Sequence, residues 1–91
     1  MATIAVLLKL DEQSVPQALL EAGEKLDGVE GKAILDFSSV RRIDSSALKA
    51  MEEFAGKADT QGVKVVLRGV NVDIYKVLTL AQLVSRFSSV N

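Results

Sequence analysis

Three short aliphatic segments, at residues 3–10, 33–37 and 63–68, constrain the fold of this chain most strongly. Each is rich in Val, Ile, Leu or Ala and has the length that is typical of a buried β-strand. The stretches between them are long enough for a helix and too long for a hairpin turn. Connections of this length require the strands to run parallel, with right-handed crossovers. The sequence therefore predicts an α/β fold with a small, mostly parallel sheet.

A helical pattern follows the first strand segment. Ser14, with Gln17 three residues later, fits a capping box, and Pro16 is tolerated in the first turn of a helix. Apolar residues then recur at helical spacing and form one stripe: Val15, Leu19, Ala22 and Leu26. The pattern predicts a helix that starts after Ser14 and ends near Asp27 and Gly28.

Capping residues and apolar stripes indicate two further helices. Asp44-Ser45-Ser46 caps the second helix, and Gly62 ends the connection that follows it. The apolar face of the second helix consists of Leu48, Met51, Phe54, Ala55 and Ala58. Asn71 is the expected cap of the last helical region. The apolar side of that region consists of Ile74, Val77, Leu78, Ala81 and Val84.

The composition restricts both the domain organisation and the chemistry. Ninety-one residues are too few for two stable cores, so we expect a single domain over residues 1–91. The chain contains no Cys and no His, which excludes thiol nucleophiles, disulfides, imidazole catalysis and the usual zinc sites. A formal net charge of −1 and four aromatic residues do not match a nucleic-acid-binding protein.

No segment of the chain is suited to crossing a membrane. The longest aliphatic run, residues 4–8, is far shorter than the roughly 20 residues that a membrane helix requires. No positively charged start precedes this run, so a signal peptide is not indicated either. We therefore expect a soluble, cytoplasmic protein without membrane insertion, and no motif indicates a cofactor or a metal ion.

The start of the second predicted helix is the strongest candidate site. Asp44, Ser45 and Ser46 carry short oxygen side chains, which commonly satisfy the free N–H groups of a first helical turn. The same position suits a phosphoacceptor, because a phosphate at a helix N-terminus meets outward N–H groups and a favourable dipole. The two roles are compatible, since one hydroxyl can serve in both.

Three other features are weaker indications of chemistry. Asp36 and Asp44 could form a carboxylate pair, but no nucleophile or set of metal ligands accompanies them. Gly69-Val70-Asn71 lacks the Gly-Lys-Ser/Thr ending of a P-loop and the spaced glycines of a dinucleotide site, so we interpret it as a turn and a cap. Arg41-Arg42 is interpreted as part of a solvated loop. The residues thus favour a protein that is not an enzyme.

The stretch from Ile34 to Leu48, which reads ILDFSSVRRIDSSAL, is similar to one known family. It resembles the STAS domain family of bacterial anti-sigma-factor antagonists, in which an aliphatic strand ends in an aspartate and a loop leads to Asp-Ser-Ser/Thr-Gly-Leu. Residues 57–70 look like the glycine, strand, glycine pattern of that family, and residues 77–83 resemble its last helix. The resemblance covers residues 31–87.

This resemblance implies a binding module that is switched by phosphorylation. In the family, the serine directly after the aspartate is phosphorylated by a partner that is both an anti-sigma factor and a serine kinase; that serine corresponds to Ser45, with Ser46 as the second choice. The unphosphorylated form binds the kinase and frees a sigma factor for transcription, whereas the phosphorylated form releases the kinase. The partner-binding residues that the resemblance implies are Asp36, Asp44, Ser45, Ser46 and Ala47.

Two departures from the family pattern and one alternative function accompany this interpretation. Ala47 stands where the family usually has Gly, and a methyl group there would obstruct the close approach of a partner's backbone. Family members tend to begin with two strands, and only residues 3–10 are available here, so we expect an open sheet edge and, through it, a homodimer. The alternative is a STAS accessory subunit of a bacterial ABC transporter, which binds constitutively and uses Ser45 only as part of a helix cap.

Overall fold

The computed structural model describes residues 4–24, 26 and 31–91 and has the expected α/β architecture. Four parallel strands pair in sequence order: β1 (Ile4–Lys9), β2 (Gly31–Asp36), β3 (Lys64–Arg68) and β4 (Ser89–Val90). The helices of the described residues are α1 (Val15–Glu24), α2 (Ser45–Gln61) and α3 (Val72–Leu80). Two 3-10 turns, η1 (Glu12–Ser14) and η2 (Val84–Arg86), precede α1 and β4.

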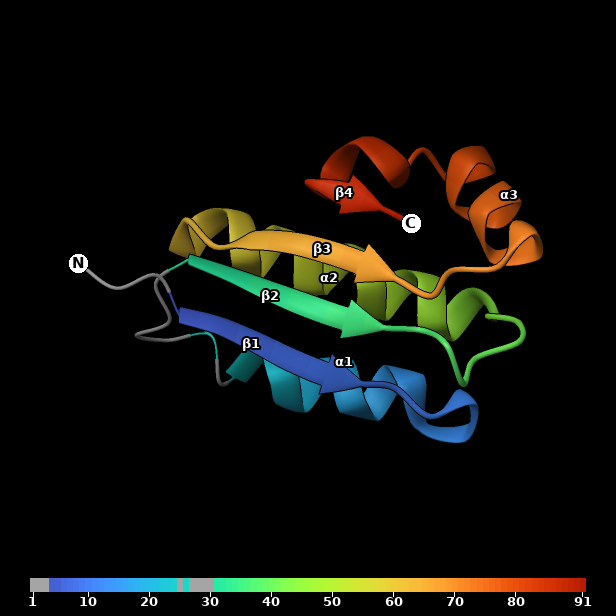
Figure 1. Cartoon of the computed structure of the whole chain (residues 1–91), viewed down its shortest axis with the longest axis horizontal. Coiled ribbons are helices and arrows are strands. Elements are labelled where there is room, and N and C mark those ends of the chain that lie inside the picture. Colours follow the sequence, from blue (N-terminus) through green and yellow to red (C-terminus); the bar gives the residue numbers. More distant parts are fainter. Residues whose placement is uncertain (1–3, 25, 27–30) are drawn as a thin grey trace.

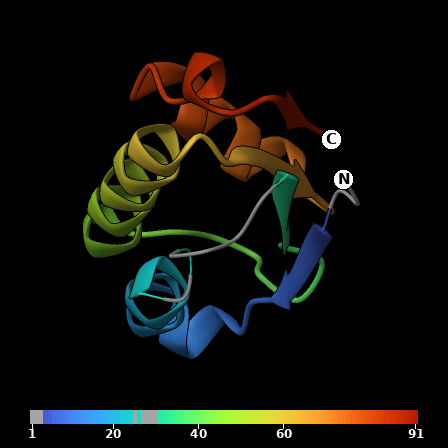
Figure 2. The same ribbon diagram turned by 90° about the vertical axis from the view of Figure 1, so that its left-hand side faces the viewer.

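Helices α1 and α2 lie side by side on one face of the sheet, whereas α3 follows the carboxyl end of β3 (Figures 1 and 2). Side chains alternate between the two faces along each strand. The buried side chains of β2 and β3 that face the helices are Ala33, Leu35, Val65 and Leu67. The opposite face of the sheet is not covered by any helix of the described residues (Figure 2).

The predicted apolar stripes form the core between the helices and the sheet. Every residue of the first stripe is at most 4% exposed, as expected for Val15, Leu19, Ala22 and Leu26. The second stripe is buried at Met51, Phe54, Ala55 and Ala58. Leu48 of the same stripe is half-buried, and Ala47, which the stripe did not include, is only 3% exposed.

Ser14 is not the N-cap of the first helix, contrary to the prediction. It lies inside η1, and Asp11 caps this turn by accepting a hydrogen bond from the backbone N–H of Gln13 at 3.1 Å. An N-cap residue needs an extended backbone, which Asp11 has and a residue within a 3-10 turn lacks. The predicted helix end near Asp27 and Gly28 lies outside the described residues, as does the first residue of the first predicted strand.

The last part of the chain also differs from the prediction. Helix α3 ends at Leu80, and Gln82 adopts a left-handed φ of 59°. Ala81 is therefore exposed, and Leu83 enters the core in its place. The chain then forms β4, which was not predicted because two residues give no periodic pattern in the sequence.

Strand β1 forms one edge of the sheet. It pairs with β2 from Ile4 opposite Gly31 to Lys9 opposite Asp36, and no other strand of the described residues pairs with it. The expected open sheet edge is therefore found at β1 among the described strands. Its outward N–H and C=O groups are available to another strand.

Two glycines have the same left-handed φ of 71° but different surroundings. Gly62 ends α2, its N–H faces the carbonyl oxygens of Ala58 and Asp59, and a Cβ atom on Gly62 would meet nothing within 4 Å. Gly69 follows β3, and a Cβ atom there would lie 2.8 Å from the backbone nitrogen of Ser38. Gly69 therefore allows the loops after β2 and β3 to touch.

We expect Gly69→Ala to destabilise the protein more than Gly62→Ala does. Both replacements cost about 1–2 kcal/mol because a left-handed φ is unfavourable for Ala. Only Gly69→Ala also forces its backbone away from Ser38, which we expect to add about 1–3 kcal/mol. Urea unfolding of the two variants measures the difference. Equal losses of stability would show that the contact between the loops contributes nothing.

Candidate functional site

The loop of residues 37–44 joins β2 to α2 at the carboxyl end of the sheet, where open α/β proteins usually carry their binding sites (Figure 1). Phe37, its first residue, is fully buried and donates its N–H to the carbonyl oxygen of Arg68 at 2.8 Å. Val40 is also buried and donates its N–H to the carbonyl oxygen of Phe37 at 2.9 Å. The first half of the loop is therefore anchored in the core.

Asp36 holds the start of this loop. Its Oδ1 atom accepts a hydrogen bond from the N–H of Ser38 at 2.9 Å, and its Oδ2 atom lies 3.5 Å from a guanidinium nitrogen of Arg68. The pKa of the Asp36 carboxyl lies below its ordinary value, mainly because the backbone N–H of Ser38 stabilises the charged form. The Arg68 guanidinium makes a smaller contribution. Because Asp36 is only 8% exposed, its carboxylate mainly serves contacts within the chain.

Asn71 ties the middle of the loop to α3. Its Oδ1 atom accepts a hydrogen bond from the N–H of Ile74 at 2.8 Å, so Asn71 caps α3 as predicted. Its Nδ2 atom donates to the carbonyl oxygen of Arg41 at 2.8 Å and lies 3.5 Å from that of Val40. One side chain thus links the crossover after β2 to the crossover after β3.

The start of α2 presents the two candidate serines at the surface. Asp44 is its N-cap, as predicted, and the Oδ1 atom of Asp44 accepts a hydrogen bond from the N–H of Ala47 at 2.8 Å. Ser45 is the first helical residue, and both Ser45 and Ser46 are exposed. Ala47 belongs to the hydrophobic core. The structure therefore brings Asp44, Ser45 and Ser46 together at the surface, with Ala47 beneath them and Asp36 buried at the start of the loop.

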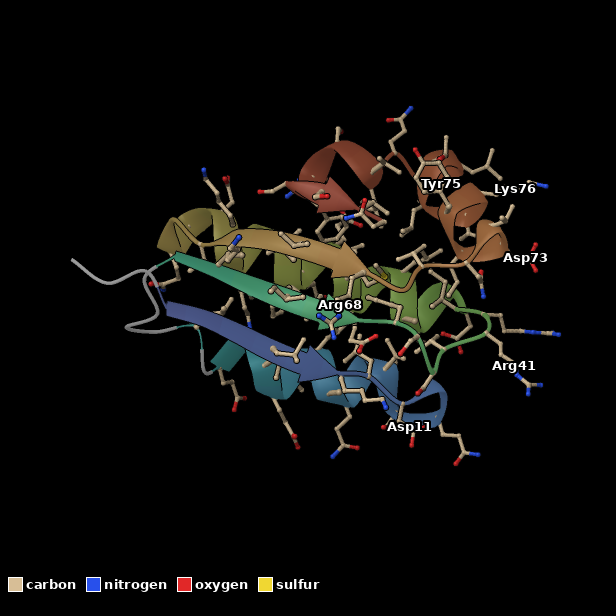
Figure 3. The ribbon with its side chains drawn as sticks, in the orientation of Figure 1. Asp11, Arg41, Arg68, Asp73, Tyr75 and Lys76 are labelled. Atoms are coloured by element: carbon tan, nitrogen blue, oxygen red, sulfur yellow. The ribbon has the colours of Figure 1, made fainter. Side chains whose placement is uncertain are left out.

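Two hollows adjoin the start of α2. A groove of about 230 Å³ between α1 and α2 has a largely apolar lining that includes Ser46. A wider hollow of about 590 Å³ is lined by Asp44 together with Arg41, Arg42 and Gln13. The arginine pair of the loop therefore shares a hollow with the N-cap carboxylate of α2, and Figure 3 shows Arg41 pointing outward from this end of the molecule.

The described residues do not form a metal site, and none of their helices is both long and apolar enough to span a membrane. The carboxylates of Asp36 and Asp44 each accept a hydrogen bond from a separate backbone N–H group, that of Ser38 and that of Ala47. Both carboxylates are thus engaged in local structure. This arrangement does not support an acid–base pair.

Sequence reasoning missed Ser38 and Arg68 as residues that shape the site. The order Asp36-Phe37-Ser38 is the pattern of a turn in which an aspartate binds the N–H group two residues later, so Ser38 had a local signal. Arg68 had none, because its contact with Asp36 depends on the register of two strands. The hydrogen bond from Asn71 to Arg41 joins residues thirty positions apart, so no local sequence pattern indicated it either.

Comparisons with known proteins agree with this geometry. The family model of the STAS domain matches residues 6–90. The fold is similar to that of a sulfate transporter family protein from Wolinella succinogenes, with a TM-score of 0.83 and 17% identity, covering 94% of this chain and 75% of that chain. No match was found among curated protein sequences.

Two structures of the protein TM1081 are also similar to this chain. The NMR structure has a TM-score of 0.79 and 19% identity, covering 98% of this chain and 75% of that chain. The crystal structure of the Thermotoga maritima protein, described as a candidate anti-sigma factor antagonist, has a TM-score of 0.74 and 20% identity. It covers 100% of this chain and 75% of that chain. At these identities the likeness establishes a shared fold.

We expect Asp36→Asn to reduce the loss of stability that acid causes. The pKa of Asp36 is lowered in the folded state, so the carboxylate stabilises the fold above its ordinary pKa of about 3.9, and this contribution is lost as the pH falls below that value. Thermal unfolding of wild type and variant between neutral pH and about pH 3 measures the effect. The exposed Asp59 provides the control variant Asp59→Asn. Identical pH profiles for wild type and Asp36→Asn would contradict this role of Asp36.

Proposed function

This chain belongs to the STAS domain family, and we propose that it is an anti-sigma-factor-antagonist-like binding module that is regulated by phosphorylation of Ser45. In this proposal the unphosphorylated form binds a serine-kinase anti-sigma factor in the cytoplasm and so affects transcription. Phosphorylation by the same partner ends the binding. The observation that carries the proposal is the exposed Ser45 at the first position of α2, directly after the N-cap Asp44.

A phosphate on Ser45 would change the charge of this surface strongly. It adds about −1.5 to −2 charges, whereas the whole chain has a formal net charge of −1. A doubly charged phosphate about 6 Å from a carboxylate of the partner is repelled by roughly 1.4 kcal/mol in water and by about 5.5 kcal/mol at an effective dielectric near 20. The helix dipole offsets only about 0.3–1 kcal/mol at an exposed site. Phosphorylation would therefore disrupt binding to an acidic surface more than it would stabilise α2.

The surroundings of Ser45 support a switch that acts on a preformed surface. The loop before it is held by Asp36 and Asn71, so a new charge at Ser45 would act without any rearrangement of that loop. Ala47 is only 3% exposed, so its methyl group, in place of the usual glycine of the family, lies in the core and leaves the surface that a partner would meet clear. The proposed contact consists of Asp44, Ser45 and Ser46, with Asp36 and Ala47 supporting it from below.

We expect Ser45→Ala to abolish phosphorylation while binding to the partner kinase persists, because only the hydroxyl is lost from an exposed position. We expect Ser45→Glu to weaken binding by about tenfold or more, because a carboxylate brings negative charge to the same place. Mass spectrometry after incubation with kinase and ATP measures the first effect, and calorimetric titration measures the second.

An exposed serine outside the proposed contact supplies the control for both measurements. Ser85→Ala, in η2, leaves Ser45 in place and is expected to keep both phosphorylation and binding. Full phosphorylation of Ser45→Ala would move the acceptor to Ser46 or to another residue. An unchanged dissociation constant for Ser45→Glu would show that charge at this position is not the switch.

A second candidate is a STAS accessory subunit of a bacterial ABC transporter; one structural neighbour is described as a sulfate transporter family protein, which links this fold to transport. In that case the domain binds its partner constitutively, and Ser45 is only the first residue of α2. A pull-down from the native host with wild type and Ser45→Glu as parallel baits separates the two functions. A kinase that is recovered by wild type alone supports the switch, whereas an ATPase that is recovered by both baits supports the transporter subunit.

The open edge of β1 supports a homodimer as a further part of the proposal. Because β1 pairs only with β2 among the described strands, its outer backbone groups can pair with β1 of a second copy. We expect light scattering at about 1 M salt to show a rise from one chain to two across about a tenfold range of concentration, because backbone pairing is not screened by salt. A constant mass of one chain over that range would rule out pairing through this edge.

A further inference from the structure

The face of the sheet opposite α1 and α2 is open, although parallel sheets are usually covered on both faces (Figure 2). The register of the strands places three rows of side chains on this face. The middle row consists of the apolar residues Leu7, Ile34 and Val66, with Ser89 of β4 as the register partner of Val66. Leu7, on the edge strand β1, is 55% exposed, so this row presents a large aliphatic side chain to solvent.

The row toward the amino ends of the strands contains two like charges side by side. Lys32 of β2 is the direct register partner of Lys64 of β3, and both residues are exposed. Like charges directly opposite each other destabilise a sheet. The pair of ammonium groups therefore suits an anionic group placed over the face from outside.

The row toward the carboxyl ends of the strands adds more positive charge. It consists of Lys9, Asp36 and Arg68, and Figure 3 shows Arg68 on this face. The whole face thus has four cationic side chains and one carboxylate, a formal charge of +3. Because the chain as a whole has a formal charge of −1, all its other residues together have −4. This face therefore has a net positive charge, whereas the rest of the chain has a net negative charge.

The outer surface of α1 and α2 has the opposite charge. The exposed charged residues of these two helices are five acids and two lysines, a formal charge of −3: Glu21, Glu24, Glu52, Glu53, Asp59, Lys49 and Lys57. Leu20, which lies on the same surface, is 52% exposed. Glu24 and Glu53 line one hollow of about 700 Å³ between the helices. This helical surface therefore combines carboxylates with an exposed leucine.

We propose that the open sheet face of one copy of this chain docks on the outer surface of α1 and α2 of a second copy. The two surfaces have opposite formal charges of +3 and −3, and each exposes a leucine, Leu7 on the sheet and Leu20 on the helices. Docking covers the sheet with a second helical layer, which is the usual arrangement of a parallel sheet. Two open sheet faces would instead oppose like charges.

This contact differs from pairing through the β1 edge. It joins two different surfaces, so every added copy leaves one sheet face and one helical surface free, and assembly continues beyond two chains. Charge attraction drives it, so salt weakens it, since the screening length falls from about 30 Å at about 0.01 M to about 3 Å at about 1 M salt. Pairing of two β1 edges stops at a dimer and depends little on salt.

Sedimentation and light scattering of the wild-type chain test the assembly. At low salt we expect the average mass to rise past two chains with concentration, and at about 1 M salt to stay at or below two chains, the limit for pairing through the β1 edge. A mass of one chain at low salt over the whole range overturns the proposal. A plateau at two chains that salt does not change overturns it as well and supports the β1 edge instead.

Charge reversal on each surface tests which surfaces meet. We expect Lys32→Glu/Lys64→Glu and Glu24→Lys/Glu53→Lys each to form nothing larger than a dimer alone, because each then has two surfaces of like sign. Mixing the two variants restores complementary pairs and is expected to restore assembly. All four positions are exposed, so circular dichroism is expected to show unchanged folding. Failure of the mixture to assemble overturns the proposal.

A matched control variant distinguishes the loss of this specific contact from repulsion caused by the changed net charge. Lys76→Glu/Arg86→Glu changes the net charge by the same amount as Lys32→Glu/Lys64→Glu, but at exposed positions on α3 and η2. We expect this control to assemble like the wild type. If it loses assembly to the same degree as Lys32→Glu/Lys64→Glu, net charge rather than the sheet face is the cause, and the proposal fails.

Discussion

The backbone of Ser38 lies so close to Gly69 that no side chain fits between them, and the candidate site depends on this contact. It brings the loop after β2 against the loop after β3. Two side chains then complete the junction: Asp36 accepts a hydrogen bond from the N–H of Ser38, and Asn71 donates to the carbonyl oxygen of Arg41. The position at which α2 begins, and with it that of Ser45, is thus determined by the neighbouring crossover as much as by α2 itself.

Features that depend on local chemistry were predictable from the sequence. Asp44 and Asn71 cap helices because their side-chain oxygens reach backbone N–H groups three residues later, and this requires only the local sequence. Gly62 ends α2 because its conformation is left-handed. The three longer strands were recognisable because their aliphatic segments are separated by helix-length connections. Where two local signals competed, as at Asp11 and Ser14, the choice was wrong, because both residue types favour caps.

Features that depend on tertiary contacts were not predictable in this way. The register that places Arg68 beside Asp36 arises from the packing of two strands that are far apart in the sequence. The burial of Ala47 was accessible in principle, because Ala47 precedes Met51 by one helical turn and so shares its buried face. Because Ala47 follows the serine motif, its methyl group was instead expected to face a partner at the surface. The predicted stripe of the second helix omitted Ala47, although the spacing from Met51 accounts for its burial.

The order of the strands has a consequence for how this chain folds. Each strand pairs with the strand that follows it in the sequence, so the sheet extends in one direction as the chain proceeds. In a sheet of this kind the first and last strands do not pair. Two neighbouring strands can pair as soon as the single crossover between them has formed. Folding rates rise as the sequence separation of contacts falls. Each strand can therefore join the sheet once the crossover before it has formed, without a contact between the two ends of the chain.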